Sequence, residues 1–220
     1  MPFYIPALIW SAFIKQDVNS LTQNKSKLSG EINVKTSECL LLASIKRISK
    51  VRKTTINDVM MSAVTTALGN LFKKRKENVK EINMVIPVSI RFGFPKSRQA
   101  FEHINKITAY PMRLPLTDSM VEAYPKISKV TKLMRSRFAQ IYSSYAMSSG
   151  LVSVLPRFMM SKAVHDMSEK FTICFSNTPG PIKEFFFKTP EGSIMKNISC
   201  SNYSIVAGNN GFILLCISTG

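Results

Sequence analysis

Histidine is the most frequent general base in enzymes, and this sequence has only two. His103 is followed by Ile104 and Asn105, and His165 by Asp166, so neither has a second histidine beside it. Adjacent residues on a helix do not share a face, so Asp166 would point away from His165. We therefore interpret His103 as a loop residue before a strand and His165 as a helix surface residue. Neither is assigned as a catalytic residue.

Other familiar catalytic and metal-binding patterns are also missing. The sequence has no GxSxG elbow for a serine nucleophile and no GxxxxGK phosphate loop. Its four cysteines lie in apolar stretches without CxxC spacing, so we expect buried thiols in a reducing compartment, no metal site and no permanently bound cofactor. These cysteines are Cys39, Cys174, Cys200 and Cys216.

Three groups of residues remain as site candidates. Asn57 and Asp58 open a predicted helix after two threonines, where helix capping is the ordinary role of such residues. A rigid turn follows a predicted strand, and a group of basic residues follows another and has the charge to bind phosphates. The turn comprises Asn177, Pro179, Gly180 and Pro181, and the basic group comprises Arg91, Lys96 and Arg98.

The elements that must position these residues alternate between helices and strands. This order predicts an α/β or α+β layered domain, with a mixed sheet flanked by helices. The last strand is continuously apolar and is expected to be central. The expected helices are residues 38–51, 56–74, one from Asp118 to about residue 145, and 155–167; the expected strands are residues 32–34, 82–91, 105–116, 171–179, 184–188, 193–201 and 212–218.

Several local features refine this prediction. In the first helix Leu41, Ile45 and Ile48 share one face and should be buried. Pro87 places its strand near a sheet edge or a bulge, since proline cannot donate to the ladder. Pro125 should lie in the first turn of the helix that Asp118 caps. Residues 17–31 are polar and are expected to form an exposed connection.

The net charge of +17 favours anionic partners, namely nucleic acid, acidic lipid headgroups or a phosphorylated cofactor. The densest basic run, residues 73–76, is interpreted as a solvated helix end. Residues 1–14 resemble neither a secretory signal nor a spanning helix, although Trp10 suits a shallow interfacial contact. Residues 138–156 carry no charge but are too polar to span a membrane.

Four segments in this order resemble the C-terminal domain of the wax ester synthase/diacylglycerol acyltransferase family. They are the Thr-x-Asn-Asp-Val helix start (55–59), the Pro-Val-Ser-x-Arg strand (87–91), the Ser-Asn-x-Pro-Gly-Pro turn (176–181) and the late apolar strand (211–218). Their order and spacing carry the resemblance, which covers roughly residues 28–220. It implies one half of a CoA-dependent acyltransferase-like fold, similar to chloramphenicol acetyltransferase. Residues 1–30 would then be a crossover or linker, and residues 31–220 a domain shortened at its C-terminal end.

The resemblance also implies a reaction. The family transfers a long-chain acyl group from acyl-CoA, a cosubstrate, to a fatty alcohol or diacylglycerol, and the second histidine of an HHxxxDG motif in the other half is the base. This sequence lacks the motif, so we expect the chain alone to be inactive and to need that half in cis or in trans. Asn57 and Asp58 would then support the tunnel between the halves, the 177–181 turn would line its cofactor side, and the basic group would meet the phosphates of CoA.

The implied location is intracellular, at the periphery of the endoplasmic reticulum, lipid droplets or plasma membrane. Two alternatives stay open. The first is a noncatalytic partner or a degenerate half that keeps only lipid or protein contacts. The second is a basic nucleic-acid or membrane-surface module, although nucleic acid is not expected because no helix shows an Arg-rich face interleaved with aromatics.

Overall fold

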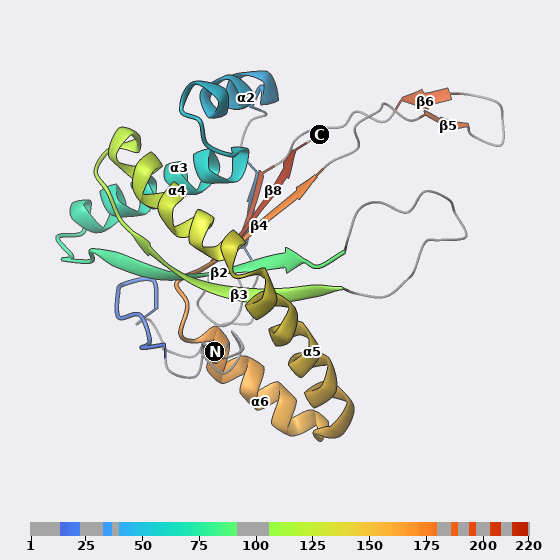
Figure 1. Cartoon of the computed structure of the whole chain (residues 1–220). Helices are drawn as coiled ribbons and strands as arrows, with labels where there is room; N and C mark the ends of the chain where they lie inside the picture. The colour runs from blue at the N-terminus through green and yellow to red at the C-terminus, as the bar shows by residue number, and fades with distance from the viewer. Residues whose placement is uncertain are drawn as a thin grey trace.

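A mixed sheet of six strands organises the chain in the computed structural model (Figure 1). The structure describes residues 14–22, 33–36, 40–91, 106–179, 186–188, 194–196, 203–207 and 213–219. The strands lie in the order β1-β7-β8-β4-β2-β3, and β5 and β6 form a separate hairpin. Their bounds are β1 Asn33–Thr36, β2 Glu81–Ser89, β3 Ile107–Pro115, β4 Ile173–Pro179, β5 Phe186–Lys188, β6 Ile194–Lys196, β7 Tyr203–Ala207 and β8 Ile213–Thr219.

Strand direction determines which ends of the strands meet. β2, β4 and β8 are mutually parallel, so their carboxyl ends face the same edge of the sheet. β3 pairs antiparallel with β2, and β7 pairs antiparallel with β8. The predicted mixed α/β architecture is confirmed, and the apolar strand β8 has a neighbour on each side, as expected for a central strand.

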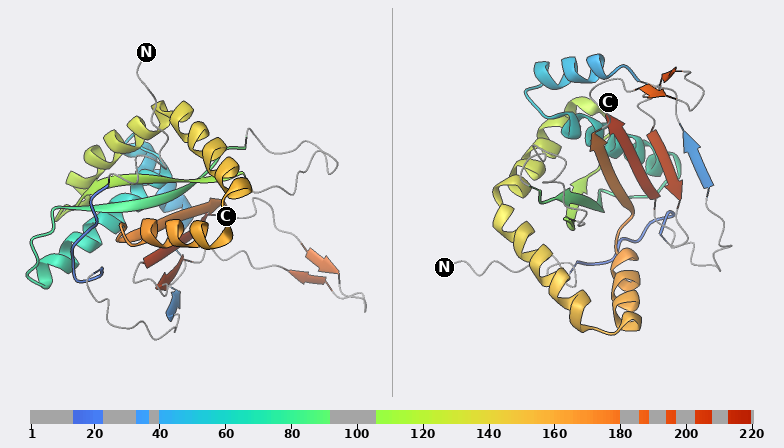
Figure 2. Two further views of the ribbon diagram at one scale, coloured as in Figure 1. Left: turned by 90° about the horizontal axis from the view of Figure 1, so that it is seen from below. Right: turned by 90° about the vertical axis from the view of Figure 1, so that its right-hand side faces the viewer.

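Helices lie on both faces of the sheet (Figures 1 and 2). One face carries α3 (Ile56–Lys74) and α4 (Met120–Ser136), with α2 (Leu42–Val51) beside α3. The long α5 (Phe138–Val154) leads to α6 (Arg157–Ser168), which lies on the opposite face. The core between α3, α4 and the sheet includes the fully buried Met61, Phe72, Ile82, Met84, Leu114, Ile127 and Phe175.

The bounds predicted for α3 are confirmed, and its solvated basic end is confirmed too. A capping box begins the helix: Asp58 N–H donates to Thr55 Oγ1 (3.1 Å), and Thr55 N–H donates to Asp58 Oδ2 (3.0 Å). The run at residues 73–76 is exposed at the other end of the helix, where Lys73 pairs with Asp118 at 2.7 Å. The helix therefore has a fixed start, which positions the residues of its first turn.

Other helix predictions need correction. Of the three apolar residues predicted to share a buried face of the first helix, only Ile45 is buried, since Leu41 is 76% and Ile48 37% exposed. Ser119 rather than Asp118 caps α4, because the Asp118 carboxylate is turned toward Lys73. Pro125 lies inside α4 beyond its first turn, and the single long helix that was predicted is divided in two at residue 137.

One strand prediction is confirmed and one was wrong. Pro87 lies near a sheet edge as predicted, because β2 is next to the edge strand β3. The parallel pairing of β2 with β4 involves only Met84 and Val85, so the missing N–H of Pro87 falls beyond that ladder. β7 lies after the range 193–201 predicted for a strand, and only the three residues of β6 fall within that range.

The segment 17–22 is not the exposed connection that its polarity predicts. Asn19 is only 3% exposed. Asp17 Oδ2 accepts hydrogen bonds from Asn83 N–H (2.6 Å) and Thr172 Oγ1 (2.5 Å), and Asn19 Nδ2 donates to Thr172 Oγ1 (2.9 Å). The polar side chains therefore complete the hydrogen bonding where β2 and the chain leading into β4 begin, which explains their burial.

Asp17 gives a prediction for the pH dependence of stability. Burial raises the pKa of its carboxyl, against the lowering effect of the hydrogen bonds from Thr172 and Asn83. A raised pKa in the folded state means that the contribution to stability is complete below the unfolded pKa and is lost as pH rises through the folded pKa. The free energy of unfolding of the native chain minus that of Asp17→Asn should therefore fall as pH rises from 4 to 7 in urea titrations; a constant or rising difference would contradict this.

Candidate functional site

The start of α3 meets the carboxyl end of β4. Asn57, in the first turn of α3, accepts a hydrogen bond at Oδ1 from Nδ2 of Asn177. The Oδ1 atom of Asn177 is buried and has no partner among the residues that the structure describes. Two site candidates that lie far apart in the sequence are thus brought together, and they leave an acceptor without a donor at the edge where the parallel strands end. Ligands of open α/β sheets bind at this edge.

Asp58 has a different role from its neighbour. Its side chain is fully buried, Oδ2 belongs to the capping box, and Oδ1 accepts from Thr131 Oγ1 at 2.7 Å. The Arg135 guanidinium lies 3.9 Å from the same oxygen. The carboxylate therefore joins α3 to α4, and neither of its oxygens is exposed to solvent. It stabilises the first turn of α3, which includes Asn57.

The remaining predicted residues are only partly described. Arg91 is exposed just after β2, at the same edge of the sheet as Asn177. Pro179 ends β4. Gly180, Pro181, Lys96 and Arg98 lie outside the described residues, as do His103 and Trp10.

An apolar cavity of about 660 Å³ separates α6 from the sheet. Val85, Pro87 and Ala109 form the sheet side, and α6 forms the other. Cys174 lines it and is partly exposed, so the expectation of four buried thiols is wrong at this position; the side chains of the other three cysteines are not described. The cavity has the size and polarity of a site for an apolar ligand. A larger cavity of about 860 Å³ beyond the far end of α3 is lined by charges of both signs and is less suited to one.

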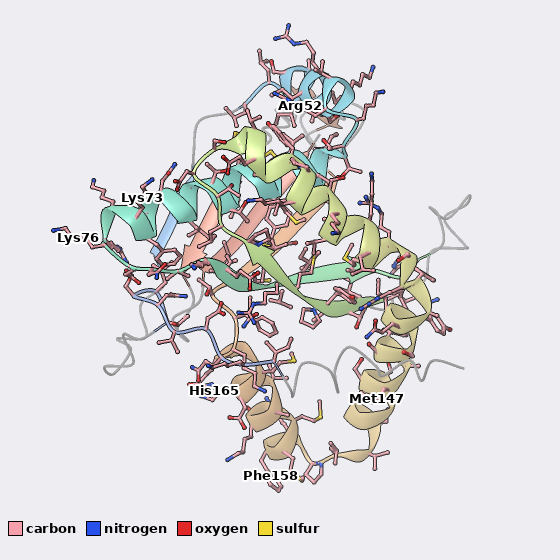
Figure 3. All side chains as sticks on the ribbon, turned by 60° about the vertical axis from the view of Figure 1, so that its left-hand side comes forward. Arg52, Lys73, Lys76, Met147, Phe158 and His165 are labelled. Atoms are coloured by element: carbon pink, nitrogen blue, oxygen red, sulfur yellow. The ribbon has the colours of Figure 1, made fainter. Side chains whose placement is uncertain are left out.

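His165 lines the apolar cavity from α6 but is not enclosed by it. Its side chain is 53% exposed, and Nε2 lies 3.6 Å from Glu169 Oε1 one turn along the helix. Figure 3 shows it on α6 near the sheet, with Phe158 at the far end of the helix. The expected helix-surface position is confirmed.

Sequence reasoning missed the partners of Asp58 and the cavity beside α6. Thr131 is a polar residue on the buried face of α4, next to Ile127 and Val130. A polar residue on an apolar stripe indicates a buried hydrogen-bond partner, which here is Asp58. Nothing in the local sequence predicts that α6 leaves space beneath it. No group of acidic, histidine or cysteine side chains suited to a metal ion occurs among the described residues, and no helix of that part of the chain has the length and apolarity to cross a membrane.

Comparison with known proteins agrees with this architecture. Residues 105–206 match the family model of the WS/DGAT C-terminal domain. The match runs from just before β3 into β7 and includes Asn177, whereas Asn57 lies before it. The resemblance inferred from the sequence motifs is confirmed. No curated protein sequence matches the chain.

A solved acyltransferase structure shows the same fold. The wax ester synthase/diacylglycerol acyltransferase from Marinobacter aquaeolei VT8 is 15% identical with a TM-score of 0.55, and the alignment covers 89% of this chain and 42% of that protein. The chain thus spans less than half the length of this relative. The first condensation domain of the calcium-dependent antibiotic synthetase is 12% identical with a TM-score of 0.46, over 97% of this chain and 42% of that one; no functional conclusion follows at that distance.

Proposed function

We propose that this chain is the C-terminal half of an O-acyltransferase that transfers a long-chain acyl group from acyl-CoA to a fatty alcohol or diacylglycerol. The match of residues 105–206 to the WS/DGAT C-terminal domain carries the proposal. The fold shared with a wax ester synthase/diacylglycerol acyltransferase supports it. The 220 residues contain no HHxxxDG motif, so the catalytic base is proposed to come from a second half, in cis or in trans.

The reaction requires a base that this chain does not supply. The alcohol oxygen attacks the thioester carbon while its proton passes to the base, the carbon–sulfur bond breaks, and the CoA thiolate leaves and takes up a proton. The proposed contribution of this chain is to bind and orient. The apolar cavity beside α6 would hold the acyl chain, and the edge with Asn57, Asn177 and Arg91 would face the polar part of acyl-CoA.

Exposed apolar side chains on α6 support a second half docking nearby. Phe158 is 73%, Met159 46% and Val164 55% exposed, and Figure 3 shows Phe158 at the outer end of the helix. Side chains of this kind in water favour self-association or contact with a partner or a membrane surface. A peripheral location at an intracellular membrane or lipid droplet belongs to the same proposal.

A complementation assay tests the proposal. The purified chain is incubated with labelled palmitoyl-CoA and either hexadecanol or diacylglycerol, with and without a separately produced HHxxxDG half. We expect ester formation only when both halves are present. Removing a general base lowers a rate by about 10²–10⁴-fold, whereas His165→Ala changes only part of the wall of the apolar cavity, so we expect the reconstituted rate to fall by less than about tenfold. Robust turnover by the chain alone, or a loss of about 10²-fold or more in the reconstituted rate of His165→Ala, would refute the division of labour between the halves.

Filling the apolar cavity should change the preference for acyl length. Ala109 lines the cavity on the sheet side, so Ala109→Phe should exclude long chains more than short ones. We expect the kcat/KM of the reconstituted enzyme for palmitoyl-CoA to fall about tenfold relative to that for octanoyl-CoA, the order of effect of a changed apolar pocket. Ile107→Phe is the matched control, because Ile107 is on the same strand and exposed but does not line the cavity. Equal effects of the two variants would contradict this use of the cavity.

A further inference from the structure

Four cationic side chains surround a third, smaller cavity of about 580 Å³ on the opposite side of the sheet from α6. Arg52 and Lys53 come from the turn between α2 and α3, and Lys129 and Lys132 from one face of α4. Figure 3 shows Arg52 at the end of α2 beside α4. We call this cavity the basic groove.

The basic groove contains no compensating negative charge. No Asp or Glu lines it, and none of its four cations forms an ion pair with a described residue. The acidic residues nearest along the chain are Glu122, which is exposed beside Val121 but does not line the groove, and Asp58, which is fully buried and bound to Thr131. The large cavity beyond the far end of α3 differs, since its lysines alternate with Asp17, Glu77, Glu81 and Asp118. Uncompensated cations around a concave surface attract anions.

The groove also offers positioned polar groups. The Arg52 guanidinium stacks over the Tyr124 ring at 5.4 Å, which restricts its orientation. Thr54 lines the groove, and its Oγ1 is buried without a partner among the described residues. A buried hydroxyl in a native protein normally has a partner, so this oxygen is suited to donate to a ligand. The groove is therefore more than a group of exposed lysines.

The backbone conformation of the groove is also unusual. Lys53 has a φ of 51°, in the left-handed region that glycine adopts more readily. Lysine at this position directs a positive charge into the turn at a conformational cost. The cost is consistent with a role for the charge, and it makes glycine a substitution that removes the charge without disturbing the turn.

We propose that the basic groove binds a phosphomonoester group. Its dianion matches several converging cations and a hydroxyl donor better than a carboxylate or a diester would, because it presents three acceptor oxygens with nearly two charges. The phosphate can belong to a soluble molecule such as coenzyme A or to a lipid headgroup such as phosphatidic acid. The inference does not rest on the proposed acyl transfer, and its test measures no turnover.

Binding is measured on the full chain by calorimetry with coenzyme A, dephospho-coenzyme A and inorganic phosphate, and by cosedimentation with phosphatidylcholine vesicles with or without phosphatidic acid. We expect Lys129→Ala/Lys132→Ala to weaken binding of the phosphomonoester probe by about tenfold or more, because each charge-assisted hydrogen bond is worth roughly a factor of ten. Lys53→Gly and Thr54→Val should each weaken it by about threefold or more. Lys53→Gly should do so without lowering the Tm.

The control Lys74→Ala/Lys126→Ala removes two exposed helix lysines outside the groove and should leave affinity within about twofold at matched ionic strength. If the chain binds coenzyme A more tightly than dephospho-coenzyme A and the groove variants abolish this difference, the ligand is a soluble phosphomonoester. Binding to phosphatidic acid vesicles that depends on the groove, without that preference, identifies a lipid headgroup. Absence of binding to all of these probes, or equal losses in the groove and control variants, would overturn the proposal.

Discussion

Replacing Asp58 with alanine is expected to lower the free energy of unfolding by about 3 kcal/mol, the sum of a lost helix cap and a lost buried charge-assisted hydrogen bond. The variant leaves Thr55 N–H without its side-chain acceptor and Thr131 Oγ1 without its strong acceptor. Arg135 is 44% exposed, so it regains water and adds little to the loss. Urea unfolding followed by circular dichroism measures the change.

Asn57→Ala is the matched control, because Asn57 directly precedes Asp58 and is exposed. Its free energy of unfolding should change by less than about 1 kcal/mol, typical of surface substitutions. A double-mutant cycle of Asp58→Ala with Thr131→Val should give a coupling of about 1–2 kcal/mol, since the two side chains share a hydrogen bond. Similar destabilisation by Asn57→Ala, or zero coupling in the cycle, would show that the carboxylate does not join α3 to α4.

Gly69→Ala is expected to lower the free energy of unfolding by about 2 kcal/mol, the scale of overpacking in a tight contact. A Cβ at this position would lie 2.7 Å from the backbone oxygen of Thr117, so the connection between β3 and α4 must shift. Alanine favours a helix over glycine by about 1 kcal/mol, and the expected loss is net of that gain.

Gly150→Ala on α5 is the opposite case. No heavy atom lies within 4 Å of the added Cβ, so only the helix preference acts, and the free energy of unfolding should rise by about 0.5–1 kcal/mol. Thermal unfolding of both variants gives the comparison. A Gly69→Ala variant as stable as Gly150→Ala would mean that α3 and residue 117 are not in close contact.

The sequence predicted elements well where a pattern is long and local. α3 has a stripe of apolar residues over its whole length, and Thr55 is followed by Asp58 at the spacing of a capping box, so both its start and its end were predicted. β8 was predicted as central because it is uniformly apolar. β7 was missed because its five residues lie among polar residues and carry too short a pattern.

Features that depend on distant partners were not accessible from local patterns. The Asn57–Asn177 hydrogen bond joins residues 120 positions apart, and periodicity carries no information about such a pair. Asp17 and Asn19 are typical of an exposed loop by composition, yet Asn19 is buried and Asp17 half-buried because their side chains hydrogen-bond to Asn83 and Thr172. The family resemblance placed Asn57 and Asn177 in separate roles, and only the fold brings them to one edge.

The order of strands in the sheet also governs when the domain can form during synthesis. β4 lies between β2 and β8, and β1 is attached only through β7, so the β2–β3 pair waits for β4, and β1 waits for a strand made more than a hundred residues later. Such long-range pairing folds slowly, and on the ribosome the edge of β2 stays unpaired until β4 emerges and the edge of β4 until β8 emerges. Stop codons placed between residues 180 and 212 should therefore yield chains that chaperones retain or proteases remove, even though the helices that the structure describes have all been translated.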